Sequence, residues 1–306
     1  MRLPAFAHIT EVGPRDGLQN EARVMPTEDK VRLIAQLAAS GIGEIEVTSF
    51  THPAWIPNLA DAEEVVRATR HLPVGAYGLI PNRRGMERAQ RAGLTGMTFV
   101  FSATDGHNRR NLNRPTEESL AEILDLHAAA AADGLRRRIS LSTVFGCPFD
   151  GAVPDARIHA IVARLVAGGC ERIGLCDTIG VADPVQVDRL SRGLIARFPG
   201  IVFELHLHNT RGCALANVLA GLQAGIVHFD TAIGGLGGCP YAPGATGNVA
   251  TEDVVSMLEA MGVRTGIDQA ALLASDRRLA EWRGTPLDSA VWRVAQRCPP
   301  ESAAVP

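Results

Sequence analysis

The sequence predicts an α/β fold, a TIM-type (β/α)8 barrel with a short helical appendage at its C-terminal end, and three observations carry this prediction. Short β-rich segments alternate eight times with longer segments of helical periodicity, which is the pattern of such a barrel. The length of 306 residues fits one barrel with an appendage. A doubly wound open sheet also alternates, but it usually has fewer units, and no GxGxxG motif follows an early strand here.

The positions of the strands and helices follow from the spacing of apolar residues along the chain. The predicted strands span residues 8–12, 43–48, 74–79, 96–101, 138–144, 172–176, 201–208 and 226–232. The predicted helices span residues 27–40, 58–71, 83–92, 116–133, 155–167, 183–198, 213–224 and 251–261. Asp155 and Asp183 are the expected N-terminal caps of two helices. Glycines are expected to close five of the helices: Gly41, Gly93, Gly134, Gly168 and Gly225.

The last part of the chain, residues 266–298, also has a helical pattern and is expected to pack beside the barrel. The sequence therefore predicts a catalytic barrel over residues 1–265 and a C-terminal helical extension over residues 266–306.

The composition is that of an ordinary globular protein, with 46% hydrophobic and 21% charged residues. The net charge of −3 makes no electrostatic case for nucleic acid or an anionic membrane as a partner. No apolar run approaches the ~20 residues needed to cross a bilayer, and a strand-like segment begins at residue 8, which leaves no room for a signal peptide. The six cysteines are scattered and are expected to be reduced thiols. We therefore expect a cytoplasmic protein.

Lysine is nearly absent from the sequence, since Lys30 is the only one. A Schiff-base aldolase, a pyridoxal-phosphate enzyme and a P-loop nucleotidase each need a lysine at the centre of the site. Lys30 is expected on the polar face of the first helix, after a cap at Thr27, where it serves none of these chemistries.

The seventh predicted strand carries a candidate metal site. Alternation along a strand places Glu204, His206 and His208 on the same side. Two histidines at positions i and i+2 can present their imidazoles to one ion. The alternative is a pair of hydrogen-bonded histidines inside the barrel.

The first predicted strand ends in Arg15 and Asp16, at the rim where the seventh strand also ends. Asp16 offers carboxylate oxygens to a metal, and Arg15 is a fixed cation beside it. Taken alone, Arg-Asp-Gly is an ordinary turn. One aspartate together with two histidines, with positions left open, suits Mg²⁺, Mn²⁺ or Zn²⁺.

Two further carboxylates stand at strand ends, Glu46 on the second strand and Asp177 on the sixth. Either can orient a ligand or move a proton. The alternative for each is a buried ion pair with Arg15.

A long glycine-rich segment, residues 234–248, follows the eighth strand and is predicted to be a lid or binding element. Within it, Cys239 is either an acid or base delivered by lid closure or a small packed thiol. Asn248 either caps the last barrel helix or supplies an amide oxygen to the metal. The segment after the fourth strand is basic and contains Arg109, Arg110 and Arg114. These arginines either bind phosphates or a carboxylate at the rim or form a solvated face.

Several of these segments occur together in one known family. The segments are GPRDGLQNE, the Glu46 strand followed by Thr-Ser-Phe, CDTIG, HLHNT and GLGGCPYAPGATGNVATED. With them the chain resembles the hydroxymethylglutaryl-CoA lyases of the DRE-TIM metallolyase superfamily, from about residue 11 to the end of the eighth predicted helix. The cysteine-containing string is long and specific, whereas RDG and HxH alone would indicate only the superfamily.

The resemblance implies a metal site and a substrate. The implied ligands of the metal, Mg²⁺ or Mn²⁺, are Asp16, His206, His208 and Asn248. The implied substrate is an acyl-CoA thioester, 3-hydroxy-3-methylglutaryl-CoA, which is cleaved to acetyl-CoA and acetoacetate. Members of the family are usually homodimers.

The resemblance also implies roles for four other residues. Arg15 would stabilise the enolate that forms, and Cys239 would give or take a proton on a mobile loop. Glu46 and Asp177 match the supporting acidic positions of the family.

The sequence departs from the family pattern at two places. Asn209 stands where an acidic residue usually follows the second histidine, and Arg109-Arg110-Asn111 replaces Lys-Lys-Asn. A related substrate such as citramalyl-CoA therefore stays open, as do a condensing synthase of the isopropylmalate type and a non-catalytic barrel that senses metal or acyl-CoA. Cys298 is a candidate for a redox-sensitive contact between subunits.

Overall fold

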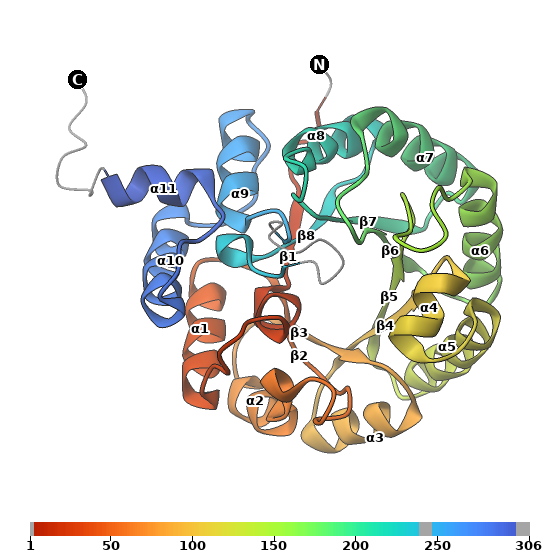
Figure 1. Ribbon diagram of the computed structural model, residues 1–306, viewed down its shortest axis with the longest axis horizontal. Helices are drawn as coiled ribbons and strands as arrows, with labels where there is room; N and C mark the ends of the chain where they lie inside the picture. Colours follow the sequence, from red (N-terminus) through yellow and green to blue (C-terminus); the bar gives the residue numbers. More distant parts are fainter. Residues whose placement is uncertain (1–2, 239–246, 298–306) are drawn as a thin grey trace.

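The computed structural model describes residues 3–238 and 247–297 and confirms the predicted TIM barrel. Eight parallel strands pair in chain order, and the eighth pairs with the first to close the ring. Helices surround this ring on the outside (Figure 1). Because parallel strands end at the same rim, the residues that follow each strand meet at one mouth of the barrel.

Each strand begins and ends within two residues of its predicted position. The strands are β1 (His8–Glu11), β2 (Glu44–Ser49), β3 (Gly75–Ile80), β4 (Gly96–Ser102), β5 (Arg136–Ser142), β6 (Arg172–Asp177), β7 (Val202–Leu207) and β8 (His228–Thr231). The barrel helices are α1 (Thr27–Ala39), α2 (Ala62–Thr69), α3 (Arg83–Ala92), α5 (Thr116–Ala132), α6 (Asp155–Ala167), α7 (Pro184–Arg197), α8 (Ala214–Ala224) and α9 (Thr251–Ala260).

The basic segment after β4 contains a short helix, α4 (Asp105–Leu112), that the sequence analysis did not predict. Its sequence, DGHNRRNL, has a single apolar residue, so it lacks the periodicity that marks an amphipathic helix. Local contacts hold it instead. The Asp105 carboxylate accepts a hydrogen bond from the backbone N–H of Thr116, and Asn113 ends the helix in the left-handed conformation.

The predicted helix ends are only partly right. Asp183 caps α7, since its side chain accepts a hydrogen bond from the N–H of Gln186. Asp155, in contrast, is the first residue of α6, because Pro154 occupies the cap position, and no side chain caps this helix. Gly93 ends α3 in the left-handed conformation as expected.

Lys30 is predicted on the polar face of the first helix, and the structure buries that part of α1. Its side chain is buried, and Nζ donates to Asp61 Oδ1 at 2.6 Å and to the backbone oxygen of Asn58 at 2.5 Å. Thr27 does not cap α1 either, because its hydroxyl donates to the other oxygen of Asp61. Asp61 thus draws the polar side of α1 against the segment that leads into α2.

The apolar core lies between the strands and the helices, whereas the inside of the barrel is strongly polar. Large side chains such as Ile34, Phe99 and Phe229 fill the outer layer. Inside the ring, Arg138 and Arg172 are paired with carboxylates from several strands. This ionic lumen leads up to the mouth where the candidate site residues stand.

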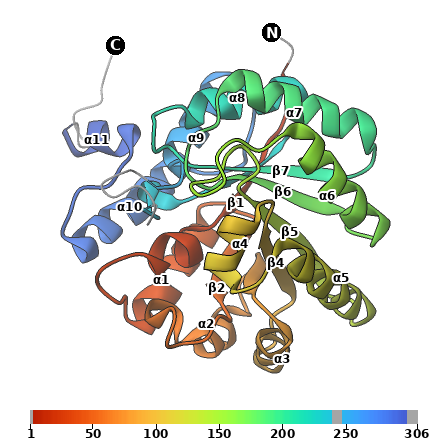
Figure 2. The ribbon, with the colours of Figure 1, turned by 45° about the vertical axis from the view of Figure 1, so that its right-hand side comes forward.

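Two further helices form the C-terminal extension, α10 (Gln269–Arg283) and α11 (Ala290–Arg297). They stand outside the ring of barrel helices, against α1 and α9 (Figures 1 and 2). Leu272 and Leu279 of α10 belong to the same hydrophobic core as the barrel. Among the described residues, no helix is long and apolar enough to cross a membrane.

Candidate active site

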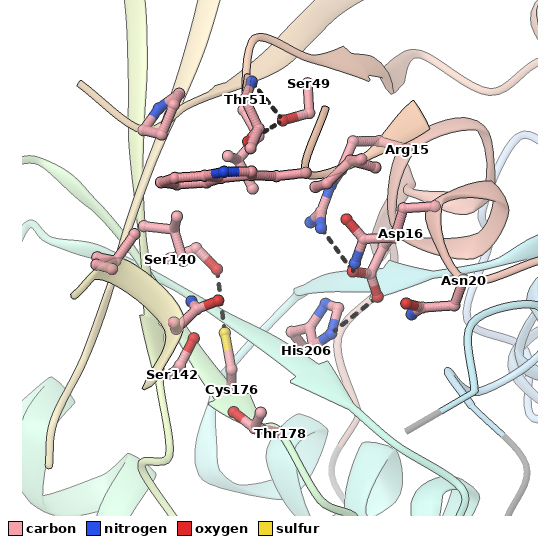
Figure 3. Close-up of a pocket in the computed structure, with 18 of the residues that line it drawn as sticks. Arg15, Asp16, Asn20, Ser49, Thr51, Ser140, Ser142, Cys176, Thr178 and His206 are labelled. Atoms are coloured by element: carbon pink, nitrogen blue, oxygen red, sulfur yellow. Dashed lines mark hydrogen bonds and ion pairs between the residues drawn. The ribbon is translucent and has the colours of Figure 1, made fainter. Parts of the chain in front are cut away.

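A cavity of about 420 Å³ opens at the mouth of the barrel. Arg15, Asp16 and Asn20 line one side of it, while Ser140, Ser142, Cys176 and Thr178 line the other (Figure 3). The cavity also receives His206 and His208 from the end of β7. The residues predicted from two separate strand ends therefore share one space.

A five-residue turn of π-helical geometry, Gly13–Gly17, presents Arg15 and Asp16 to this cavity. The backbone N–H groups of Arg15, Asp16 and Gly17 all point to the carbonyl of Val12, at 3.1, 2.7 and 3.3 Å. Gly13 is needed here because a Cβ atom would lie 2.5 Å from the Glu11 carboxylate, which accepts the Gly13 N–H. The turn fixes two adjacent charged side chains at the rim.

Asp16, His206 and His208 form a group that could hold a metal ion, with one ligand atom of each within 4.8 Å of the others. The Nε2 atoms of the two imidazoles lie 3.2 Å apart, and the Nε2 atom of His206 lies 3.8 Å from Asp16 Oδ2. The predicted convergence of the first and seventh strands on one point is therefore present in the structure.

The protonation of Asp16 and His208 suits metal binding, whereas, against the effect of burial, Asp230 and Asp16 raise the pKa of His206, so a metal ion would displace a proton there. Burial opposes ionisation of Asp16, but Arg15, His206 and His208 outweigh it and lower the pKa of the carboxyl to about 2. Burial and the neighbouring His206 lower the pKa of His208 to about 4, so its imidazole is neutral near pH 7. A carboxylate and neutral imidazole nitrogens are the forms that bind divalent metals.

Asn248, the last residue of the glycine-rich segment, lies beside this group. Its Nδ2 donates to Asp16 Oδ2 at 2.8 Å and to the backbone oxygen of Leu236 at 3.1 Å. Its Oδ1 is buried and has no hydrogen-bond partner among the described residues. Since α9 begins at Thr251, with Ala250 in the cap position, Asn248 does not cap that helix. A buried amide oxygen without a partner fits a ligand to a cation.

Arg15 is held by two carboxylates. Nη1 donates to Asp16 Oδ1 at 2.5 Å, and Nε donates to Glu46 Oε2 at 2.5 Å. Burial alone would lower the pKa of Arg15, but the charges of Asp16 and Glu46 raise it. Glu46 is fully buried, so the structure places it in the buried ion pair with Arg15 and not on the cavity wall.

Asp177 is held by backbone groups, unlike Glu46. Its carboxylate accepts hydrogen bonds from the backbone N–H groups of Val181 and Ala182, at 2.8 and 3.1 Å. The alternative interpretation, an ion pair of Asp177 with Arg15, is wrong, because Asp16 and Glu46 are the ion-pair partners of Arg15 within the described chain. Burial raises the pKa of Asp177 to about 6.

Two buried residues behind the site escaped the sequence analysis. Asp230 on β8 accepts a hydrogen bond from His206 Nδ1 at 3.3 Å, and Arg138 on β5 donates to the other oxygen of Asp230 at 2.7 Å. The sequence signal that could have found them is a charged residue at an inward-facing position of a buried strand, because such a charge needs a partner. Such a position predicts a partner but does not name it.

The three arginines of the predicted basic rim have separate environments. Arg109 is exposed and lies 3.9 Å from Asp105, Arg110 lies over the ring of Phe149 at 4.2 Å, and Arg114 pairs with Glu122. The cavity-lining residues of α4 are His107, Asn111 and Leu112. Cys239 and Cys298 lie outside the described residues.

Comparison with known proteins assigns the chain to a family. The HMGL-like family model matches residues 7–278. A hydroxymethylglutaryl-CoA lyase of Bacillus subtilis is 46% identical over 290 residues, which cover 94% of this chain and 97% of that protein. An (R)-citramalyl-CoA lyase of Chloroflexus aurantiacus is 41% identical over 297 residues, with 94% of each chain covered.

Solved structures agree with this assignment. A crystal structure of the B. subtilis HMG-CoA lyase has a TM-score of 0.94 at 45% identity and covers 97% of this chain and 100% of that one. An HMG-CoA lyase from Acinetobacter baumannii, in complex with coenzyme A and 3-methylmalate, has a TM-score of 0.91 at 38% identity, with 99% and 98% covered. The chain belongs to the HMGL-like family and is a carbon–carbon lyase.

Proposed function

We propose that this protein cleaves 3-hydroxy-3-methylglutaryl-CoA to acetyl-CoA and acetoacetate with the help of a divalent metal, Mg²⁺ or Mn²⁺. The observation that carries the proposal is the meeting of Asp16, His206 and His208 beside the buried cation Arg15, at the mouth of the barrel. The names of the relatives support the choice of substrate.

The donor set of the site fits a divalent metal. Asp16, His206 and His208 would hold it, with the unpartnered amide oxygen of Asn248 as a further ligand. One carboxylate with three neutral donors leaves a net positive charge and open positions for substrate oxygens. A divalent ion bound here would supply the charge that lowers the pKa of the tertiary hydroxyl of the substrate and orients that group.

Arg15 is the group that we assign to the enolate. Its Nε and Nη1 are occupied by Glu46 and Asp16, while Nη2 has no acceptor among the described residues. The guanidinium is always charged and lines the cavity, so Nη2 can donate to the oxygen on which negative charge develops. Because two carboxylates already fix the plane of the guanidinium, little reorganisation accompanies the reaction.

The reaction needs two proton movements. The hydroxyl proton passes to water, the bond between the carbinol carbon and the α-carbon of the thioester breaks, and the hydroxyl carbon becomes the ketone of acetoacetate. The electron pair passes to the thioester as an enolate, whose carbon then takes a proton to give acetyl-CoA. We assign this proton to Cys239, on the glycine-rich loop after β8, as the family resemblance implies.

The two remaining acidic residues, Glu46 and Asp177, act through other residues that line the cavity. Glu46 orients Arg15. Asp177 closes the turn through the N–H groups of Val181 and Ala182, and this turn carries Thr178 into the cavity wall. Both are therefore assigned supporting roles.

The wall opposite Arg15 suits an acyl group that carries its own carboxylate. Hydroxyl groups of Ser140, Ser142 and Thr178 line it, together with the thiol of Cys176. Burial raises the pKa of that thiol to about 12, so it stays neutral. These neutral groups can donate hydrogen bonds to the carboxylate of the acyl group. They bring no positive charge that would compete with the metal for Asp16.

Citramalyl-CoA is a second candidate substrate, because a (R)-citramalyl-CoA lyase is among the similar proteins at 41% identity. It has the same tertiary alcohol and thioester, but its carboxylate is attached directly to the carbinol carbon. Its cleavage would give pyruvate in place of acetoacetate.

A panel assay tests the proposal. The purified protein is stripped with EDTA, and each of the two thioesters is then supplied with and without Mg²⁺ or Mn²⁺. We expect acetyl-CoA and acetoacetate in equal amounts, only when metal is present. A higher kcat/KM for citramalyl-CoA would favour the second candidate. Cleavage of neither thioester with any metal, or net condensation of acetyl-CoA with a keto acid, would contradict the proposal.

The other properties stay predictions. We propose a homodimer in the cytoplasm, and light scattering after size exclusion, with and without reductant, tests both the dimer and a contact through Cys298. The boundary between a barrel of residues 1–265 and an extension of residues 266–306 is likewise a prediction.

A further inference from the structure

We propose that Arg138, inside the barrel, is a positioning residue that sets both the imidazole of His206 and the guanidinium of Arg15. It contacts neither of them and acts through two carboxylates, Asp230 and Glu46. The inference rests on the proposed function in that His206 is a metal ligand there and Arg15 holds the enolate.

The guanidinium of Arg138 is buried, and its three nitrogens donate to three different side chains. Nε donates to Thr98 Oγ1 at 3.0 Å, and Nη1 donates to Asp230 Oδ1 at 2.7 Å. Nη2 donates to Glu46 Oε1 at 3.4 Å, and Nη1 also lies 3.6 Å from Glu204 Oε2. Only 2% of the side chain is exposed, so solvent does not replace these contacts.

Asp230 and Glu46 each bind Arg138 with one carboxylate oxygen and a site residue with the other. Asp230 uses Oδ1 for Arg138 and Oδ2 for His206 Nδ1, at 3.3 Å. Glu46 uses Oε1 for Arg138 and Oε2 for Arg15 Nε, at 2.5 Å. One cation therefore stands behind two functional side chains that come from different strand ends.

The bond to Asp230 has a specific consequence for His206. A carboxylate acceptor at Nδ1 keeps the hydrogen on that nitrogen, which leaves the lone pair of Nε2 directed at His208 and Asp16. Such partners behind a metal-binding histidine typically contribute about 10–100-fold to metal affinity. Without Arg138, Asp230 would lose its nearest cation and could turn away from His206.

Arginine is required at this position for a geometric reason. Three buried carboxylates surround it, and its planar fork reaches them in different directions at once. A lysine ammonium is a compact charge and cannot bind Asp230 and Glu46 in their present positions together. The substitution Arg138→Lys therefore keeps the charge while removing the simultaneous contact.

Arg172 provides a matched control in the same lumen. It pairs with Glu44 and shares Glu204 with Arg138, and both guanidinium groups lie 5.4 Å from the centre of the Tyr77 ring. Among the described residues its hydrogen-bond partners are Thr10, Glu44, Tyr77 and Glu204, none of which contacts Arg15 or His206. Loss of its fork should affect folding stability but not the orientation of the site.

The test compares Arg138→Lys with Arg172→Lys in the full-length protein. Mn²⁺ affinity is measured by isothermal titration on the EDTA-stripped protein, kcat and KM with 3-hydroxy-3-methylglutaryl-CoA, and Tm by calorimetry. For Arg138→Lys we expect Mn²⁺ binding to weaken about 10–100-fold and kcat to fall by more than about 100-fold, with KM little changed. For Arg172→Lys we expect Mn²⁺ affinity and kcat close to the wild type, although Tm falls for both variants.

Two results would overturn the inference: wild-type Mn²⁺ affinity and kcat in Arg138→Lys, or equal losses in the two variants. If Arg138→Lys does not fold, Asp230→Asn and Glu46→Gln replace it. Asp230→Asn should then weaken Mn²⁺ binding, and Glu46→Gln should lower kcat with Mn²⁺ affinity unchanged; the opposite assignment, or no change in either, refutes the inference. If the wild type cleaves no thioester, the proposed function fails, while the Mn²⁺ comparison still decides whether Arg138 positions His206.

Discussion

The Nε2 atoms of His206 and His208 face each other at 3.2 Å, with Asp16 Oδ2 3.8 Å from the first of them. Two imidazole nitrogens at this distance repel unless a proton or a metal ion stands between their lone pairs. Asp230 occupies the other nitrogen of His206, and the other nitrogen of His208 has no partner among the described residues. The arrangement fits a metal ion shared by the two Nε2 atoms, or an N–H···N hydrogen bond between the two imidazoles when no ion is bound.

The first prediction concerns His208. His208→Ala removes one of the three converging ligands, so Mn²⁺ affinity should fall by at least about 100-fold, since loss of a partner behind a ligand alone lowers affinity by about 10–100-fold. Isothermal titration of the EDTA-stripped protein measures this. His159→Ala is the control, because His159 lies on α6 beside Phe198 and away from the cavity. Unchanged Mn²⁺ affinity in His208→Ala would remove His208 from the ligand set.

The second prediction concerns Arg15. Arg15→Gln keeps a hydrogen-bond donor but loses the fixed charge, so kcat should fall by about 100- to 1,000-fold, the range for one lost oxyanion donor. KM should change little, because the lost interaction strengthens only as charge develops. Steady-state kinetics with 3-hydroxy-3-methylglutaryl-CoA measure both. Arg32→Gln, an exposed arginine on α1, is the control. A rise in KM with kcat unchanged would assign Arg15 to substrate binding instead.

The metal group was predictable because two local rules point to one place. Strand periodicity puts His206 and His208 on one side of β7, and the parallel topology brings the end of β1, with Asp16, to the same rim. Neither rule needs knowledge of distant contacts. The same reasoning explains why strand positions were predicted closely.

The ionic lumen was not predictable because its pairs are set by the closed barrel. Arg138 and Asp230 are 92 residues apart, and nothing in either strand indicates that the other faces it. The burial of Lys30 was not predictable for the same reason, since its partner Asp61 is 31 residues away. A charged residue in an apolar segment predicts burial with a partner, but only the closed ring identifies the partner.

The third prediction concerns the pH dependence of folding stability. Glu252, in the first turn of α9, is fully buried; one oxygen accepts the N–H of Gly234, and the other has no partner among the described residues. Burial raises its pKa to about 8 from 4.5, against the hydrogen bonds that lower it. The folded protein therefore binds a proton that the unfolded chain has already lost between these values.

The sign follows from this proton. The raised pKa contributes stability that is fully present below about pH 4.5 and is lost as the pH rises through about 8. The Glu252→Gln side chain does not titrate, so the variant does not lose this stability as the pH rises. The difference in free energy of unfolding, variant minus wild type, should therefore rise by about 1.4 kcal/mol per pH unit between about pH 4.5 and 8. Urea unfolding at pH 5.5, 7 and 8.5, with the exposed Glu87→Gln as control, measures it; a difference that is constant with pH would refute the protonated state of Glu252.

The fourth prediction concerns the attachment of the C-terminal extension. Asp268 precedes α10, and its Oδ1 accepts hydrogen bonds from the N–H groups of Ala270 and Ala271 at 2.8 and 3.1 Å. Asp268→Ala leaves both donors without this acceptor and should cost about 1 kcal/mol, or roughly 2 °C in Tm. Asp268→Asn keeps an acceptor at the same position and should retain most of the stability. Asp268 is exposed and does not line the cavity, so kcat should be unchanged in both variants. Equal Tm values for Asp268→Ala and the wild type would mean that the packing of Leu272 and Leu279 alone holds α10 in place.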